Sequence, residues 1–149
     1  MADQHSSGEA RGASPLGVPG TATAGRPVRA QAKTVLVGGT RFLGPGVVEL
    51  LEAIASTGSV KQACQQIGLS YTKGWRLVHT LEAELGFACV ARQQGGIGGG
   101  RASLTPECRA LLDRFEDFTA QVDASVAALF AEHFPDLDGR GASGSRPIA

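Results

Sequence analysis

The sequence predicts a mostly α-helical domain with a small amount of β structure, and three observations support this prediction. Apolar residues recur at the three- and four-residue spacing of a helix in four stretches of the chain. Short β-branched or apolar runs flank glycines at two places, Gly38-Gly39 and 95–100. A length of 149 residues, 42% of them hydrophobic, allows one ordinary domain and excludes a multi-domain enzyme. The expected fold is a winged helix-turn-helix with an N-terminal β-hairpin and a long C-terminal dimerisation helix.

Both ends of the chain are expected to be disordered tails, residues 1–31 and 135–149, around one folded domain over 32–134. Both tails are rich in Gly, Ala, Ser and Pro, a composition that buries too little apolar area to offset chain entropy. No run approaches the roughly 18 apolar residues of a membrane span, and the N-terminal tail lacks the apolar block of a secretion signal. We therefore expect a cytoplasmic protein with no membrane partner.

A first hairpin is predicted ahead of the helices. Residues 33–37 and 40–43 favour extended structure, and the two-residue turn Gly38-Gly39 between them is typical of a β-hairpin. A Gly-Pro-Gly sequence then ends the hairpin. From Val47, apolar residues at helical spacing predict a first helix that ends at Gly58.

Two helices joined by a tight turn form the helix-turn-helix of this prediction. Ser59 is a suitable N-cap for the first of them, which ends at Gly68. Ser70 caps the second, which closes at Gly86. The inward stripe of this second helix consists of Gly74, Val78, Leu81 and Leu85.

A second hairpin and a long last helix follow. Strands over 87–93 and 101–104 enclose the glycine-rich tip 95–100, so this hairpin forms the wing. Thr105 caps the last helix, 106–134, which at 1.5 Å per residue is roughly 43 Å long. Because so small a domain cannot cover such a helix, its apolar stripe is expected to pair with the same helix of a second chain. The expected dimer contacts are Leu111, Phe115, Phe118, Val122, Val126 and Leu129.

Charge is unevenly distributed along the chain, although 14 basic side chains balance 14 acidic ones overall. Residues 59–101 carry five basic and two acidic side chains, a local net charge of +3. Residues 102–138 carry two basic and eight acidic side chains, a local net charge of −6. The basic stretch coincides with the predicted helix-turn-helix and wing, which suits a polyanionic partner. The acidic last helix is expected to face away from DNA.

Two motifs together resemble a known family. They are GPGVVELLEAIASTGSVKQACQQIGLSYTKGW, which starts at Gly44, and ARQQGGIGGGRASLTPECRALL, which starts at Ala91. The segment from Gly44 to about Phe134 resembles the N-terminal DNA-binding domain of molybdate-responsive ModE-type regulators, relatives of the LysR-type helix-turn-helix proteins. The resemblance implies a winged helix, a homodimer and binding to double-stranded operator DNA as a transcriptional regulator. Two positions depart from the family pattern: Ile97 replaces a usual Lys, and Gly74 replaces a usual Ala at a cost of roughly 1 kcal/mol of helix propensity unless close packing requires it.

The candidate DNA-binding residues come from the helix-turn-helix and the wing. They are Ser59, Lys61, Gln62, Ser70, Tyr71, Thr72, Lys73, Arg76, His79, Thr80, Arg92, Gly98, Gly99 and Arg101. With the apolar stripe inward, Lys73 and Arg76 face outward with polar neighbours, which suits phosphates and base edges in a major groove. Arg92 and Arg101 bracket the glycine tip, whose backbone N–H groups allow close approach to phosphates. Trp75 is expected to lie in the core.

Two other functions are consistent with parts of the sequence. A winged helix can serve as a protein-interaction module without DNA binding, although such a module does not need the local charge of +3. Residues 34–44, TVLVGGTRFLG, resemble the opening of short-chain dehydrogenases, which bind NAD at a glycine turn. That fold needs an acidic residue about 20 residues further on and a second parallel strand, and Tyr71 is followed four residues later by Trp75 instead of a lysine. We therefore predict no enzyme activity and no catalytic residue.

No metal, cofactor or ligand-sensing segment is predicted. Cys64, Cys89 and Cys108 are 25 and 19 residues apart and include no CxxC pair, so we expect reduced, packed thiols. Two-domain regulators of the ModE type bind molybdate in C-terminal β-rich domains. Only residues 135–149 follow the last predicted helix, so we expect this chain to have no molybdate-sensing domain of its own.

Overall fold

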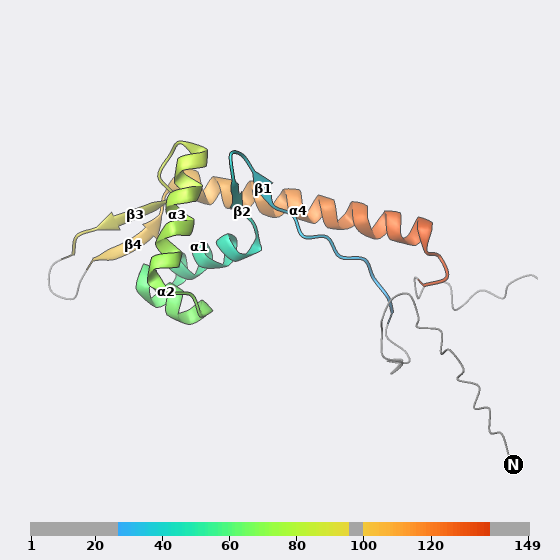
Figure 1. Ribbon diagram of the computed structural model, residues 1–149, viewed down its shortest axis with the longest axis horizontal. Coiled ribbons are helices and arrows are strands. Elements are labelled where there is room, and N and C mark those ends of the chain that lie inside the picture. The colour runs from blue at the N-terminus through green and yellow to red at the C-terminus, as the bar shows by residue number, and fades with distance from the viewer. Residues whose placement is uncertain (1–26, 96–99, 138–149) are drawn as a thin grey trace, which may run out of the picture.

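The computed structural model describes residues 27–95 and 100–137 (Figure 1). Within them the chain forms small antiparallel hairpins and a group of helices. In chain order the elements are β1 (Leu36–Val37), β2 (Arg41–Leu43), α1 (Pro45–Thr57), α2 (Val60–Ile67), α3 (Tyr71–Leu85), β3 (Val90–Gln93), β4 (Arg101–Leu104) and α4 (Pro106–His133). This is the predicted winged helix-turn-helix: α2 and α3 form the helix-turn-helix, and the β3–β4 hairpin is the wing.

The first three helices pack around one hydrophobic core, and both hairpins contribute to it. Leu43 at the end of β2 and Leu104 at the end of β4 are buried, at 0% and 6% exposure. Among the described residues no polar or charged side chain is buried. The core is therefore apolar, and the charged groups of these elements lie at the surface.

The predicted helix caps are confirmed. The hydroxyl oxygens of Ser59, Ser70 and Thr105 accept backbone N–H groups at the starts of α2, α3 and α4, at 3.1–3.2 Å. The glycines at the ends of the first three helices have φ of 69–78°, the left-handed conformation that favours glycine at this position. Helix α1 begins at Pro45, two residues before the predicted start at Val47. The fixed φ of proline suits the first turn of a helix.

The strands are shorter than predicted. The β1–β2 ladder pairs Val37 with Arg41, so the loop holds three residues instead of the predicted two. The register shifts between Val37 and Leu36, which pairs with Leu43, and residues 33–35 lie outside the strand. In the wing, β3 begins at Val90. The carbonyl groups of the two preceding residues, Ala88 and Cys89, accept the hydroxyl and the N–H of Thr105, which lies beyond the end of β4.

Helix α4 extends well past the other helices (Figure 1). Its two buried residues, Cys108 and Phe115, both lie in its first half. It ends at His133, one residue earlier than predicted, and a turn follows. Of the predicted tails, 27–31 and 135–137 contain no helix or strand, whereas 1–26 and 138–149 lie outside the described residues. No helix in the described ranges has the length and apolar character needed to span a bilayer.

Candidate nucleic-acid interface

Helix α3 has the predicted inward and outward faces. Gly74, Val78 and Leu81 are buried, and Leu85 is half-buried against the core. The exposed residues of α3 among the candidates are Tyr71, Thr72, Lys73, Arg76 and His79. Thr80 is half-buried. The structure therefore brings these candidates together along one helix, with the charged ones accessible to a partner.

Gly74 is explained by the close approach of α2 and α3. A Cβ atom at this position would collide with Sγ of Cys64 on α2. The departure from alanine noted in the sequence is thus a packing requirement, which offsets the lower helix propensity of glycine.

A groove of about 540 Å³ separates the wing from the N-terminal ends of α2 and α3. Its lining includes Ser59, Lys61, Tyr71, Arg92 and Arg101, all of them candidates from the sequence. Three of the five are cations, and they come from α2 and from both strands of the wing. This arrangement concentrates positive charge next to the exposed face of α3.

The wing is attached at its base to the helical unit. The N–H of Ala102 donates to the carbonyl of Gly58, at 2.8 Å. The N–H and the hydroxyl of Thr105 donate to the carbonyls of Cys89 and Ala88, at 3.0 and 2.7 Å. These bonds fix the orientation of β3 and β4 relative to α1 and α4. The backbone positions of Arg92 and Arg101 are therefore defined relative to the helices.

An aromatic cluster lies on the side of α3 that faces the wing. Trp75 packs against the core but is only half-buried, so it lies at the edge of the core and not inside it as expected. The ring of Tyr71 meets it edge-on with centroids 6.3 Å apart, and the ring of His79 lies 5.3 Å away. Cζ of Arg92 lies 4.9 Å from the centroid of the Trp75 ring. This contact was not predicted from the sequence, because nothing in the separation of residues 75 and 92 indicates it.

Several candidates have other local roles or cannot be placed. Ser59 and Ser70 use their hydroxyl oxygens as helix caps. A shallow surface hollow also runs along α3, lined by Tyr71, Thr72, Trp75, Arg76, His79 and Thr80. Gln62 is exposed on α2 but lines neither the groove beside the wing nor this hollow. Gly98 and Gly99, together with Ile97, lie outside the described residues.

The Gly38-Gly39 loop does not have the architecture of a dinucleotide site. The carboxylate of Glu84, on α3, accepts the N–H groups of Gly39 and Thr40 at 3.1 and 3.0 Å. A pyrophosphate would need such N–H groups free at a helix start beside a parallel strand, whereas β1 pairs antiparallel with β2. The dehydrogenase alternative is therefore wrong for this segment.

The predicted dimer stripe on α4 divides into two parts. Phe115 is 7% exposed and belongs to the core of its own domain, so it is unavailable to a partner, and Leu111 is half-buried against the same core. This differs from the expectation because the first half of α4 is needed to cover the helical unit. Further along, Phe118 and Leu129 are 48% and 54% exposed.

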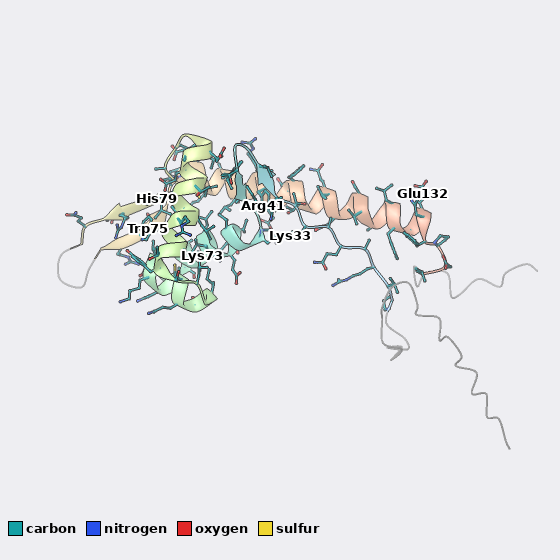
Figure 2. All side chains as sticks on the ribbon, viewed as in Figure 1. Lys33, Arg41, Lys73, Trp75, His79 and Glu132 are labelled. Atoms are coloured by element: carbon teal, nitrogen blue, oxygen red, sulfur yellow. The ribbon has the colours of Figure 1, made fainter. Side chains whose placement is uncertain are left out.

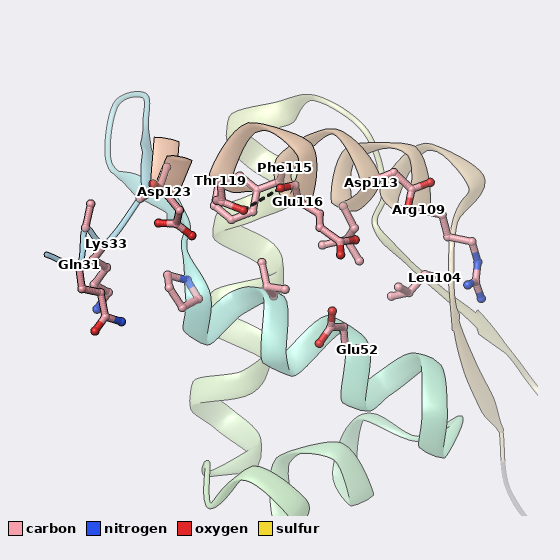
Figure 3. Close-up of a pocket in the computed structure, with 15 residues that line it drawn as sticks. Gln31, Lys33, Glu52, Leu104, Arg109, Asp113, Phe115, Glu116, Thr119 and Asp123 are labelled. Carbon is pink, nitrogen blue, oxygen red and sulfur yellow. Dashed lines mark hydrogen bonds between the residues drawn. The ribbon is translucent and has the colours of Figure 1, made fainter. Parts of the chain in front are cut away.

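A second groove, of about 910 Å³, lies between α1, α4 and residues 31–34 (Figure 3). Its acidic lining residues are Glu52, Asp113, Glu116 and Asp123. Lys33 and Arg109 are its basic lining residues. A surplus of carboxylates disfavours a nucleic acid here, which agrees with the expectation that the acidic helix faces away from DNA.

The three cysteines are buried free thiols, as expected. Burial raises the pKa of Cys89 from 9.0 to about 12, with a further contribution from the adjacent Cys108. Burial also raises the pKa of Cys64 and of Cys108. All three are therefore protonated and poorly nucleophilic at neutral pH. No cluster of metal-ligating side chains is present within the part of the chain that the structure describes.

Comparisons with known proteins agree with this geometry. Residues 47–109 match the model of the bacterial regulatory helix-turn-helix protein, lysR family. The chain is 35% identical over 96 residues to the molybdenum-pterin-binding protein MopB of Rhodobacter capsulatus, covering 64% of this chain and 34% of MopB. It is 33% identical over 81 residues to the DNA-binding transcriptional dual regulator ModE of Escherichia coli K12, covering 54% of this chain and 30% of ModE.

A solved structure, that of the CbnR_DBD–DNA complex, aligns with a TM-score of 0.43 and 25% identity, covering 56% of this chain and 95% of that one. The chain spans about a third of the length of the curated relatives it matches. The matched segment includes α2, α3 and the whole wing. Residues 47–109 are therefore similar to the LysR-family helix-turn-helix, and the similarity to ModE-type regulators inferred from the sequence is confirmed.

Proposed function

We propose that this protein binds double-stranded DNA at specific sequences and regulates transcription. The observation that carries the proposal is the exposed face of α3, where Lys73, Arg76 and His79 lie on the second helix of a LysR-like helix-turn-helix. A helix of this kind fits the major groove, where arginine pairs with guanine and small polar groups bind other base edges. The name of the relative ModE, a transcriptional dual regulator, supports the second half of the proposal.

The positions of the cations support a division of roles among them. Arg76 is two residues from both Gly74 and Val78, so it lies on the side of α3 opposite the core and is assigned to a base edge. Lys61, Arg92 and Arg101 line the groove beside the wing and are assigned to phosphates. Phosphate contacts fix the position of the protein on the duplex, and base contacts provide specificity.

We further propose that the protein acts as a homodimer through the second half of α4. Phe118 and Leu129 are about half exposed, and Val122 and Val126 lie between them on the same side of the helix. An apolar stripe at this spacing pairs with a second helix in coiled coils. A two-fold dimer would present two copies of α3 to the two halves of a palindromic operator.

The DNA proposal is tested by enriching genomic fragments on the protein, sequencing them, and measuring anisotropy with the enriched and a scrambled duplex. The Arg76→Ala variant should lose about 1–3 kcal/mol of binding free energy on the specific site and little on the scrambled one. Lys73, exposed in the first turn of α3, is likewise assigned to a phosphate, so Lys73→Ala should weaken both duplexes alike. Arg114→Ala, on α4, is the matched control and should bind like wild type. If the folded wild-type protein shows no preference for the enriched duplex, the proposal fails, and the protein-interaction module becomes the better interpretation.

The dimer proposal is tested by sedimentation velocity at micromolar concentration. The wild-type protein should sediment as a dimer, and Phe118→Glu should sediment as a folded monomer because it places a charge in the apolar contact. Glu132→Ala, on the same helix, is the control and should stay dimeric. A wild-type protein that remains monomeric when concentrated would contradict the proposal.

A further inference from the structure

Trp75 occupies a position between the exposed face of α3 and the wing (Figure 2). Its half-buried side chain packs against the hydrophobic core. Its other surroundings are the rings of Tyr71 and His79 and the guanidinium of Arg92, 4.9 Å from the ring centroid. Trp75 also lines the surface hollow that contains Arg76, and Arg92 lines the groove beside the wing. The indole therefore connects the two surfaces that the proposed function assigns to DNA.

The chemistry of this contact leaves Arg92 able to bind a phosphate. A guanidinium stacks on an aromatic face through its plane, whereas its N–H donors lie in that plane and point outward. A free arginine side chain loses considerable rotamer entropy when it is fixed on a ligand. An arginine already held against a ring loses less on binding, which favours the complex.

We infer that Trp75 is a positioning residue, which holds Arg92 of the wing beside α3 so that both elements contact the same duplex. The inference depends on the proposed function, since it concerns how the wing binds DNA. Tyr71, edge-on to the indole, and His79, one turn further along α3, hold the orientation of the ring. Trp75 thereby acts on DNA through Arg92, and its own contact with the duplex is not required.

A double-mutant cycle on DNA binding tests the inference. Trp75→Leu keeps an apolar side chain over the core but removes the aromatic face, and Arg92→Ala removes the cation. Each should lower affinity for specific and scrambled duplexes alike, by roughly tenfold, and each should flatten the dependence of log K on log salt by about one unit. The double variant should lose no more than Arg92→Ala alone, because both changes remove one contact. Trp75→Phe, which keeps a ring, should retain most of the affinity and the full salt slope.

The control is the other arginine of the wing. Trp75→Leu combined with Arg101→Ala should show multiplied losses, because Arg101 does not contact the indole. A purely structural role for Trp75 would lower the active fraction of protein without changing the salt slope. An unchanged slope in Trp75→Leu, or losses that multiply in the Trp75→Leu/Arg92→Ala variant, would overturn the inference.

A second measurement works without DNA. Trp75 is the single tryptophan of the chain, so its fluorescence reports on this site alone. Arg92→Ala should expose the indole and raise its quenching by acrylamide, whereas Arg101→Ala should leave the quenching unchanged. If Trp75→Leu fails to fold, unchanged quenching in Arg92→Ala overturns the inference by itself. If the quenching rises as expected but wild type binds no DNA, the proposed function fails and the contact remains.

Discussion

The two hairpins, β1–β2 and β3–β4, are alike in construction but have different surroundings. Both are short antiparallel pairs with glycines in the connecting loop, and they lie on either side of α3 (Figure 1). In the first, the loop N–H groups bind the carboxylate of Glu84. In the wing, Arg92 and Arg101 line an open groove beside α2 and α3. A glycine-rich loop is therefore a candidate anion site only where no carboxylate of the same chain already occupies its N–H groups.

Both hairpins contribute a buried leucine to the core, and truncation of either leucine should have the largest effect on stability. Leu43→Ala in β2 and Leu104→Ala in β4 should each lower the free energy of unfolding by about 2–5 kcal/mol, because each removes a buried leucine and leaves a cavity. Urea unfolding followed by circular dichroism measures the loss. Val37→Ala, at a 65% exposed position of β1, is the control and should change stability by less than about 0.5 kcal/mol. A loss below about 1 kcal/mol for Leu43→Ala would mean that the first hairpin does not contribute to the core.

The hairpins should differ most clearly in DNA binding. Arg101→Ala in the wing should weaken binding roughly tenfold, the effect of losing one charge-assisted hydrogen bond, and flatten the salt dependence by about one unit. Arg41→Ala, an equal charge change in the first hairpin, should leave both quantities near those of wild type. Fluorescence anisotropy across several salt concentrations compares the two. Equal losses for Arg41→Ala and Arg101→Ala would show that both flanks of α3 hold the duplex.

The Glu84 contact should affect stability and leave DNA binding unchanged. Glu84→Gln keeps the shape of the side chain but weakens the two bonds to the loop, so the melting temperature should fall by an amount equivalent to about 1 kcal/mol. Glu82→Gln, two residues earlier on α3, is the matched control because no bond to the first hairpin is lost. A melting temperature of Glu84→Gln equal to that of Glu82→Gln would contradict the role assigned to the carboxylate.

The last prediction concerns the base of the wing, and its effect appears only at alkaline pH. The pKa of Cys89 is raised from 9.0 to about 12 in the folded protein, so above pH 9 the unfolded chain binds fewer protons than the folded one. Stability is therefore complete below pH 9 and falls as the pH rises towards 12, by up to about 1.4 kcal/mol per pH unit for this thiol. Melting temperatures between pH 7 and 10.5 test this. Cys89→Ala should show a shallower alkaline decline, and an identical decline would exclude the thiol as its cause.

The amino-acid sequence by itself determined the local elements. Ser59, Ser70 and Thr105 cap helices as predicted, and the glycines after α1, α2 and α3 close them, because capping depends on residues within one turn of each other. The inward stripe of α3 was predictable for the same reason, since helical periodicity alone places Gly74, Val78 and Leu81 on one side. The motifs around the helix-turn-helix and the wing were enough to indicate the family.

Only the tertiary structure decided which side chains meet across elements. Arg92 on Trp75, Glu84 on the first loop and Cys64 against Gly74 join residues that are 10 to 45 positions apart. Phe115 followed the helical stripe of α4 in the sequence, yet the structure places it in the core of its own domain. A periodic pattern identifies the apolar side of a helix but cannot say which neighbour covers it, because that depends on how far the rest of the domain extends along the helix.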